Sequence, residues 1–275
     1  MTAVPKVIPH DWRLAFRVAP FVLLAALVKL GLDEQGWEPI ALSPLYTGLL
    51  AATIFLLGFL LAGVLADYKE SEKLPGELTA SLETIADECQ ILYEDKKAPP
   101  ALDCLYYLRE VVASVLGWLY RSEPSSPPLE RIAGLNRFFL AFEPLTQPNF
   151  IVRLKQEQSA VRRMLIRIDT IRNTSFIGAG YAIAQMAAAL IVIGLLFVDI
   201  NPRLDAIFIL CIITFLLVYI IVLIKDLDDP YQYNANGSEA GAAEVSLKPI
   251  EELEHRLSQR IAALEQSVEL QRAPD

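Results

Sequence analysis

The stretch that decides the fold is IALSPLYTGLLAATIFLLGFLLAGVLAD, Ile40–Asp67, whose first 27 residues carry no charged side chain. As an α-helix that rises 1.5 Å per residue, this run is about 40 Å long. The hydrocarbon core of a bilayer is about 30 Å thick, so the run can cross a membrane with room to tilt. It therefore predicts a membrane-spanning helix.

Within this span, Ala51, Phe55 and Phe59 recur at every fourth residue and stack along one side of a helix. Two interpretations are open. Either the phenylalanines face lipid, which is the commoner outcome for an apolar helix, or the helix lines a pore constricted by rings of phenylalanine, one set from each subunit. Small residues lie off this line, where a neighbouring helix can approach closely: Gly48, Ala52, Gly58, Ala62 and Gly63.

The composition divides the chain between a membrane and water. Hydrophobic residues make up 54% of the 275 residues, which is high for a soluble domain, yet 33 acidic and 24 basic residues are also present. The mean hydropathy is +0.38. The net charge of −9 and the lack of a long basic stripe in the sequence argue against nucleic acid as a partner.

The sequence contains no catalytic or metal-binding pattern. Its three cysteines, Cys89, Cys104 and Cys211, form no CxxC pair, and His10 and His255 lie far apart. This inventory predicts neither a disulfide framework nor a zinc site. The phosphate-loop, dinucleotide-binding, nucleophile-elbow and HExxH motifs are also missing. We therefore expect no enzyme activity, no cofactor and no metal.

The first span is predicted near the N-terminus. Val18–Val28 is an apolar run of eleven residues, a length that suits a signal peptide as well as a membrane helix. No small-x-small cleavage site follows it, which favours the helix. Extended to Leu14–Leu32, with Arg17 and Lys29 reaching out to the interface, the segment can cross a bilayer.

Two more spans are predicted towards the C-terminus. Phe176–Val198 is uncharged and rich in small residues, which favours tight packing against other helices. Ala206–Ile224 is uncharged but bulkier, and is expected to face lipid. The expected domains are residues 1–67 with the first two spans, residues 68–173 as a helical aqueous region, residues 174–226 with the last two spans, and residues 227–275 as a tail with an amphipathic helix at Pro249–Leu270.

The aqueous region is expected to be helical throughout, because apolar residues recur there at helical spacing. Its last helix, Phe150–Asn173, is rich in arginine, and its basic face is either an ion-attracting vestibule or, more commonly, a solvated face paired with acidic helices. No proline interrupts Phe150–Val198, so we expect this helix to continue into the third span. The other expected helices are Leu74–Glu94, Leu102–Tyr120 and Leu129–Phe142.

Flanking charges predict the orientation. The loops after the first and third spans are acidic, whereas the opposite flanks carry most of the lysines and arginines. By the positive-inside rule, both termini and the helical region are cytoplasmic, in a multi-pass protein of the cell (inner) membrane. Unpaired cysteines agree with a reducing compartment.

The second span resembles that of the bestrophin channels and the bestrophin-like bacterial membrane proteins. In that family, two aromatic neck positions lie four residues apart, LeuGlyPhe ends the span, and a Leu-Pro follows. Phe55 and Phe59 match the neck positions, Leu57-Gly58-Phe59 matches LeuGlyPhe, and Leu74-Pro75 matches the Leu-Pro. Asp228-Asp229-Pro230-Tyr231 resembles the family's Asn-Pro-Phe segment after the fourth span.

The resemblance implies an all-α membrane fold with four spans and a helical cytoplasmic region. It also implies a homopentamer in a lipid bilayer, with the second span around a central pore and Ala51, Phe55 and Phe59 forming an apolar neck that gates by dewetting. Chloride or another small anion is the expected permeant ion. The second candidate site is the acidic segment after the fourth span, Asp226, Asp228, Asp229 and Pro230.

The sequence also departs from the family pattern. Ala51 replaces a bulky aliphatic residue, Asp67-Tyr68-Lys69 replaces Arg-Trp-Trp, and the acidic run of the calcium clasp is absent after Tyr231, so calcium gating is not expected. A cation-conducting homologue is an alternative, given the net charge of −9. A non-conducting scaffold or sensor whose helical region binds a protein is another. A transporter is the least favoured alternative, because the last three spans contain no charged residue and no helix break.

Overall fold

A computed structural model describes residues 12–37, 39–41, 43–121, 126–174, 178–233 and 243–272. The chain forms two compact units. The membrane unit comprises Met1–Tyr68, Ser175–Pro230 and Gly241–Ala243, and the helical unit comprises Lys69–Thr174, Tyr231–Ala240 and Glu244–Asp275. The predictions for the first eleven residues and for most of the polar run after Tyr233 lie outside the described residues.

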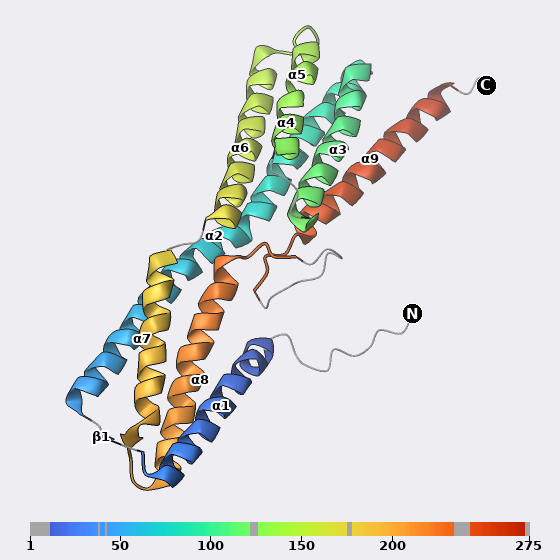
Figure 1. Cartoon of the computed structure of the whole chain (residues 1–275). Helices are drawn as coiled ribbons and strands as arrows, with labels where there is room; N and C mark the ends of the chain where they lie inside the picture. Colours follow the sequence, from blue (N-terminus) through green and yellow to red (C-terminus); the bar gives the residue numbers. More distant parts are fainter. Residues whose placement is uncertain are drawn as a thin grey trace, which may run out of the picture. The chain divides into compact units, whose positions relative to one another are not determined.

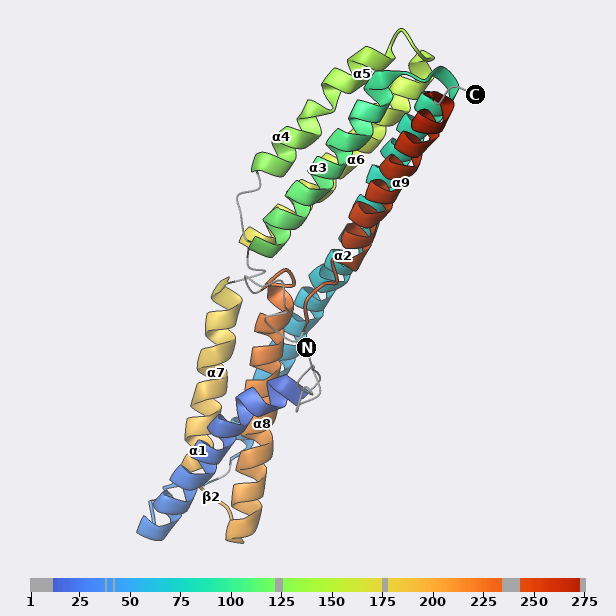
Figure 2. The same ribbon diagram turned by 90° about the vertical axis from the view of Figure 1, so that its right-hand side faces the viewer.

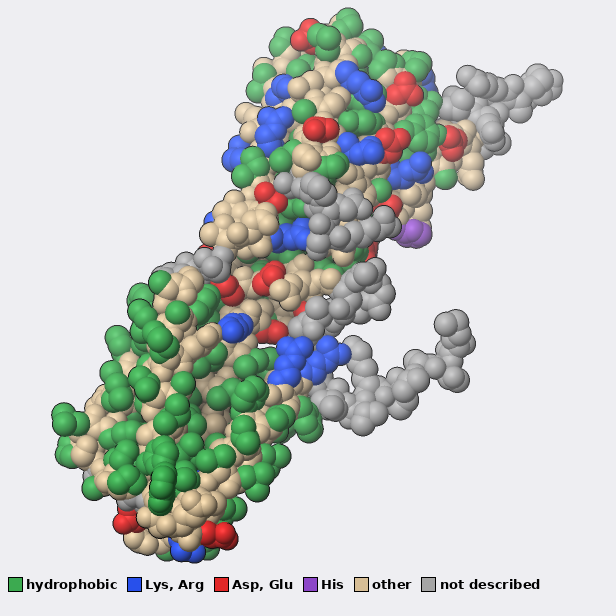
Figure 3. Space-filling model, viewed as in Figure 1, with side chains coloured by type: hydrophobic (Ala, Val, Ile, Leu, Met, Phe, Trp, Pro, Cys, Tyr) green, Lys and Arg blue, Asp and Glu red, His purple; other side chains and the backbone are tan. Residues whose placement is uncertain are grey.

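Four long helices build the membrane unit and lie side by side in Figures 1 and 2. They are α1 (Arg13–Gln35), the first part of α2 (Pro44–Lys96), α7 (Gly178–Leu196) and α8 (Arg203–Asp228). In the described part of the chain, four helical segments are long and apolar enough to cross a membrane. Three of them are α1, α2 and α8, and the fourth ends with α7. Hydrophobic side chains cover much of the face of this unit in Figure 3. The predicted all-α fold with four spans is therefore confirmed.

The second span begins four residues later than the sequence predicts. Ile40–Ala41 forms a short strand, β1, which pairs in parallel with β2 (Val198–Asp199). The helix starts at Pro44, a residue whose missing N–H costs nothing at the first helical position. Ser43 precedes it, and its carbonyl accepts hydrogen bonds from the backbone N–H groups of Tyr46 and Thr47 at 3.0 and 3.3 Å.

Lys29 is buried rather than extended to the interface, so that prediction is wrong. Its side chain is 1% exposed, and its ammonium donates to the carbonyls of Val198 at 2.8 Å and Leu196 at 3.3 Å. It also lies 3.2 Å from Asp33 Oδ1, which is buried as well. The last carbonyls of α7 have no helical N–H partners, and a cation at a helix C-terminus meets both that need and the helix dipole.

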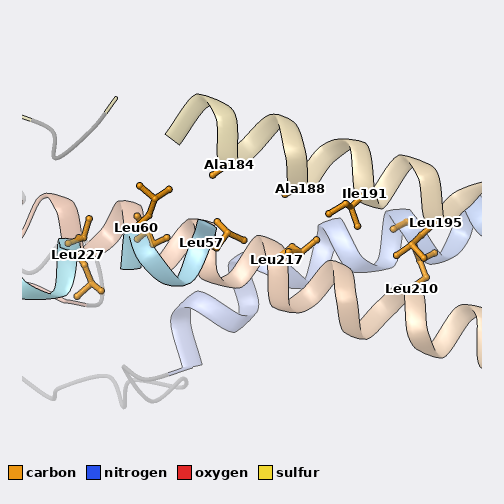
Figure 4. Close-up of a cluster of buried hydrophobic side chains, with 12 residues drawn as sticks. Leu57, Leu60, Ala184, Ala188, Ile191, Leu195, Leu210, Leu217 and Leu227 are labelled. Atoms are coloured by element: carbon orange, nitrogen blue, oxygen red, sulfur yellow. The ribbon is translucent and has the colours of Figure 1, made fainter. Parts of the chain in front are cut away.

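The core of the membrane unit lies mainly between α2, α7 and α8, with Ala25 of α1 at its side, and Figure 4 shows its side chains. Ala184 and Ala188 of α7 are almost fully buried, as expected for a span with small residues. The prediction that α8 faces lipid is wrong for one of its faces, which packs into this core, while Phe208 is 65% exposed. Other core residues are Leu57, Leu60, Val64, Ile191, Leu195, Leu210, Leu217, Ile224 and Leu227.

In the described residues, the helical unit contains the rest of α2 and five further helices. They are α3 (Pro99–Arg121), α4 (Ser126–Gly134), α5 (Asn136–Phe142), α6 (Pro148–Asn173) and α9 (Lys248–Arg272). Their apolar faces form the core predicted from the helical spacing; for example, Leu78, Leu82, Leu105 and Leu108 are 0% exposed.

Three helix boundaries in this unit differ from the prediction. The second span and Leu74–Glu94 form one helix, α2, that continues through Pro75. Leu129–Phe142 is two helices, because the Tyr107 hydroxyl donates to the Arg131 carbonyl at 3.0 Å and occupies the space where a side chain at Gly134 would lie. The helix α6 stops at Asn173, because Thr174 is extended (φ −130°), so it does not run on into α7.

We predict that Lys29→Met lowers the free energy of unfolding by about 3–5 kcal/mol, because it leaves the Asp33 carboxylate buried without its cation. The double variant Lys29→Met/Asp33→Leu removes both charges and is expected to recover the part of this loss that comes from the buried carboxylate, but not the part that comes from the carbonyls of Leu196 and Val198. Thermal unfolding in detergent, followed by tryptophan fluorescence, measures the effect, with the exposed Lys225→Met as the control. A single variant that unfolds at the wild-type temperature would contradict a structural role for the pair.

Candidate functional site

Two faces of α2 have different surroundings in the membrane unit. Leu57, Leu60 and Val64 are at most 2% exposed, because they pack into the core with α7 and α8. On the other side, Phe55 is 78% exposed and Phe59 is 63% exposed. Ala51 is exposed as well, so the three predicted neck residues share the face that the rest of the chain leaves open.

The small residues of α2 also lie mainly on this open face. Ala52 and Ala62 are exposed, and a Cβ built on Gly48 or Gly58 meets no atom within 4 Å. The expected close approach of a neighbouring helix is therefore not made at these two glycines within the described chain. The result is a smooth apolar strip, interrupted by two phenylalanines, that remains available to another molecule or to lipid.

The acidic residues after the fourth span interact with different partners. Asp226 lies 3.7 Å from Arg17 of α1, and Asp228 interacts electrostatically with the Tyr181 hydroxyl, as does Asp67. The helix α8 ends at Asp228, two residues before Pro230. Within the described ranges, no three His, Cys, Asp or Glu side chains are grouped so that they could hold a metal ion. The geometry therefore favours local ion pairing over a shared ligand site.

Tyr231, which follows this acidic segment, donates a hydrogen bond to the Ser71 carbonyl, which Pro75 leaves without its usual partner. Inside a helix, the N–H of residue 75 would bond to the carbonyl of Ser71, but proline has no N–H. The Tyr231 hydroxyl donates to the Ser71 carbonyl at 2.9 Å in a buried position instead. The Leu74-Pro75 and Pro230-Tyr231 pairs noted in the sequence are therefore parts of one structural arrangement. The signal in the sequence was a proline inside an amphipathic helical pattern. Such a proline leaves the carbonyl four residues earlier without its N–H, so another part of the chain must donate to it.

Further tyrosines hold the tail against the helical unit. The Tyr233 hydroxyl donates to the Val245 carbonyl, and its ring meets Tyr120 edge-on with centroids 5.0 Å apart. Tyr120 in turn donates to Glu251 of α9. Burial raises the pKa of Tyr231 well above its usual value, and burial followed by the hydrogen bond to Glu251 does the same to the pKa of Tyr120. Tyrosine hydroxyls are protonated at neutral pH, and the raised pKa values keep these two hydroxyls protonated further into the alkaline range.

Two arginines of α6, Arg153 and Arg167, pair with acidic residues, as the second of the two interpretations states for this face. Arg167 donates two hydrogen bonds to the carboxylate of Glu70, at 2.9 and 2.6 Å, and these bonds hold the pKa of Glu70 below its usual value. Arg153 pairs with Glu88, which is 5% exposed. Arg172 donates to the Trp118 carbonyl at 3.1 Å. These side chains therefore help to hold the helical unit together.

The helix order and the four spans define a class of helical membrane proteins, and comparison with solved structures shows which fold it is. The chain has the fold of bacterial bestrophin homologues. A variant of the homologue from Klebsiella pneumoniae matches with a TM-score of 0.76 at 14% identity, covering 90% of this chain and 99% of that chain. Another structure of this homologue matches with a TM-score of 0.74 at 15% identity, covering 91% and 99%. No family model and no curated protein matches the sequence.

We predict that Tyr231→Phe lowers the free energy of unfolding by about 1–3 kcal/mol, because it leaves the buried Ser71 carbonyl without the hydroxyl. Pro75→Ala restores an N–H to α2, so Tyr231→Phe is expected to cost less in that background. A double-mutant cycle of thermal unfolding measures this coupling. Equal costs of Tyr231→Phe in both backgrounds would show that Pro75 and Tyr231 act independently.

The raised pKa of Tyr231 also predicts how the free energy of unfolding changes with pH. A tyrosine that ionises at higher pH in the folded state contributes stability that is fully present below about pH 10 and is lost as the pH rises further. We expect the unfolding free energy to fall above pH 10 less steeply in Tyr231→Phe than in the wild type, by up to about 1.4 kcal/mol per pH unit. Parallel curves for the two proteins would contradict the assignment.

Proposed function

We propose that the chain is one subunit of an oligomeric ion channel, a homopentamer, with α2 lining the pore. The carrying observation is the open face of α2, where Phe55 is 78% exposed and Phe59 is 63% exposed while the opposite face is buried. The shared fold with bacterial bestrophin homologues supports the proposal. Ala51, Phe55 and Phe59 of each subunit would form the neck.

The composition of this face suits contact around an axis. A helix that faces only lipid has no need of small residues, whereas Gly48, Ala52, Gly58 and Ala62 let backbones of neighbouring helices approach closely. Phenylalanine rings that project between such helices narrow the space along the axis. A narrow apolar passage sheds its water, so opening and closing can follow from wetting and dewetting.

The permeant ion in this proposal is chloride or another small anion, as the bestrophin resemblance implies. An apolar neck itself discriminates weakly by charge, because it offers no fixed charge to the ion. A cation channel is the second candidate, and two observations favour it: the net charge is −9, and Arg153 and Arg167 are paired with carboxylates. The proposed location is the cell (inner) membrane, with both termini in the cytoplasm, because the positive charges flank that side.

Single-channel recording in planar bilayers under asymmetric KCl tests the neck. We expect discrete currents from the purified oligomer, and an open probability about tenfold higher in Phe55→Ala/Phe59→Ala, which corresponds to about 1.4 kcal/mol less free energy for wetting the neck. Phe208→Ala on α8, also an exposed phenylalanine in the membrane unit, is the matched control and should behave as the wild type.

The outcomes separate the candidates. The reversal potential gives the sign of the permeant ion and so distinguishes the anion channel from the cation channel. An unchanged open probability in the double variant would show that Phe55 and Phe59 do not form the neck. If neither the wild type nor the double variant carries a current, and both proteins are shown to be folded and oligomeric, the channel proposal would be wrong and a non-conducting scaffold would be favoured.

A further inference from the structure

Two of the three cysteines lie in the hairpin that α2 and α3 form in the helical unit. Only Lys97 and Ala98 separate the end of α2 from the start of α3, so the two helices run antiparallel, side by side (Figures 1 and 2). Lys97 makes the turn with a positive φ of 51°, and its N–H donates to the Tyr93 carbonyl at 2.7 Å. A connection this short determines which residues of the two helices lie opposite each other.

The two cysteines lie at the same distance from this turn. Cys89 is seven residues before Lys96, and Cys104 is seven residues after Lys97. Other buried pairs follow the same rule at four, eleven and fourteen residues from the turn, and each of their side chains is at most 4% exposed. These pairs are Leu92 with Ala101, Ile85 with Leu108, and Leu82 with Val111. The apolar faces of the two helices therefore meet in register, with the two thiols opposite each other.

The two thiols are in direct contact inside the core. Cys89 donates a hydrogen bond to the sulfur of Cys104, and both side chains are 0% exposed. Packed helices have axes about 8–10 Å apart and Cα radii of about 2.3 Å, so facing Cα atoms come as close as about 3.5–5.5 Å. A disulfide needs Cα atoms about 4.4–6.8 Å apart. The hairpin therefore holds the two cysteines at a separation that a disulfide can bridge.

We propose that Cys89 and Cys104 form a reversible disulfide when the protein meets a hydroperoxide, and that this bond is a redox-sensitive clamp between α2 and α3. All three cysteines carry free thiols in the structure, which is then the reduced state of the clamp. Cys211 lies on α8 in the membrane unit and takes no part in it. The inference does not depend on the pore proposed on α2.

The reaction passes two electrons from the two sulfurs to the peroxide. The hydrogen bond to Cys104, followed by burial, raises the pKa of the Cys89 thiol well above its usual value, so Cys89 keeps its proton and Cys104 reacts first. The Cys104 thiolate attacks the hydroxyl oxygen of the peroxide, the O–O bond breaks, and the other oxygen takes up a proton and leaves as water or an alcohol. Cys89 then loses its proton and attacks the sulfenic sulfur of Cys104, and the S–O bond breaks with release of water.

Burial makes this pair react slowly, and the position of the pair in the hairpin gives the route. Both cysteines lie about two helical turns from the hairpin end, so a local opening of that end exposes them to a small oxidant. In a reducing compartment, thiol exchange removes the bond again, so the clamp is transient. While it is present, it closes a loop of about 15 residues and restricts the unfolded chain, which stabilises the helical unit.

Peptide mapping of the intact purified protein tests the bond. The protein in detergent is treated with hydrogen peroxide, alkylated under denaturing conditions and digested with trypsin, which cleaves after Lys96 and Lys97, between the two cysteines. We expect a linked pair of peptides that contain Cys89 and Cys104 in most chains, and its loss after reduction with dithiothreitol. Cys211→Ala should form the same bond, whereas Cys104→Ala should not.

Thermal unfolding of the same samples tests the effect of the bond on stability. The oxidised wild type and oxidised Cys211→Ala should unfold roughly 5–10 °C above their reduced forms, whereas peroxide should not raise the unfolding temperature of Cys104→Ala. Failure of the folded wild type to form the linked peptides, or oxidation of either cysteine to sulfinic acid in their place, would overturn the clamp. A bond that forms only in protein unfolded in urea, or that lowers the unfolding temperature, would overturn it as well.

Discussion

The hydroxyl of Tyr231 donates the hydrogen bond that the missing N–H of Pro75 cannot, and the continuity of α2 depends on this bond. A proline in a helix interior leaves one carbonyl unpaired and costs about 3 kcal/mol or more. Here that carbonyl, on Ser71, is buried and accepts from Tyr231 at 2.9 Å. The helix therefore runs from Pro44 to Lys96 without a break. The same bond fixes the start of the tail that follows α8.

The same rule, that a buried backbone carbonyl must find a donor, shapes the far end of the membrane unit. There α7 ends at Leu196, and the ammonium of Lys29 donates to the carbonyls of Leu196 and Val198. Asp33 balances the charge, and β1 pairs with β2 between the same two turns. Hydrocarbon offers no donors, so these bonds must come from within the chain. In both places, the donor is a side chain distant in sequence from the carbonyl.

The sequence was sufficient for the features that depend on local pattern. Uncharged runs of sufficient length predict the four spans, and the spacing of apolar residues predicts the helices of the helical unit. The alignment of Ala51, Phe55 and Phe59 on one face follows from the helical period alone, and the structure leaves that face open. The domain boundaries and the function of this face stay predictions.

The features that the sequence did not reveal depend on partners far along the chain. A lysine near a span end predicts an interfacial cation, and only the position of α7 shows that Lys29 is buried instead. The sequence predicts a separate helix that begins at Leu74, and only the hydrogen bond of Tyr231 shows why α2 continues through Pro75. The break after Gly134 depends in the same way on Tyr107, which lies 24 residues from its acceptor. Each of these is a specific hydrogen bond, and helical periodicity carries no information about it.

The pairing of charges in the helical unit bears on how a channel with this fold would select ions. A row of arginines attracts anions only where its charge is not compensated nearby, because paired charges cancel within a few ångströms. Arg167 is held by both oxygens of Glu70, and Arg256 and Arg260 of α9 are held by Glu83. The charges of these three arginines are therefore compensated by neighbouring carboxylates, and the pairs contribute to the stability of the helical unit. In the proposed channel, the apolar neck offers no fixed charge to an ion, so a preference for anions would have to come from charges or backbone dipoles elsewhere along the pore.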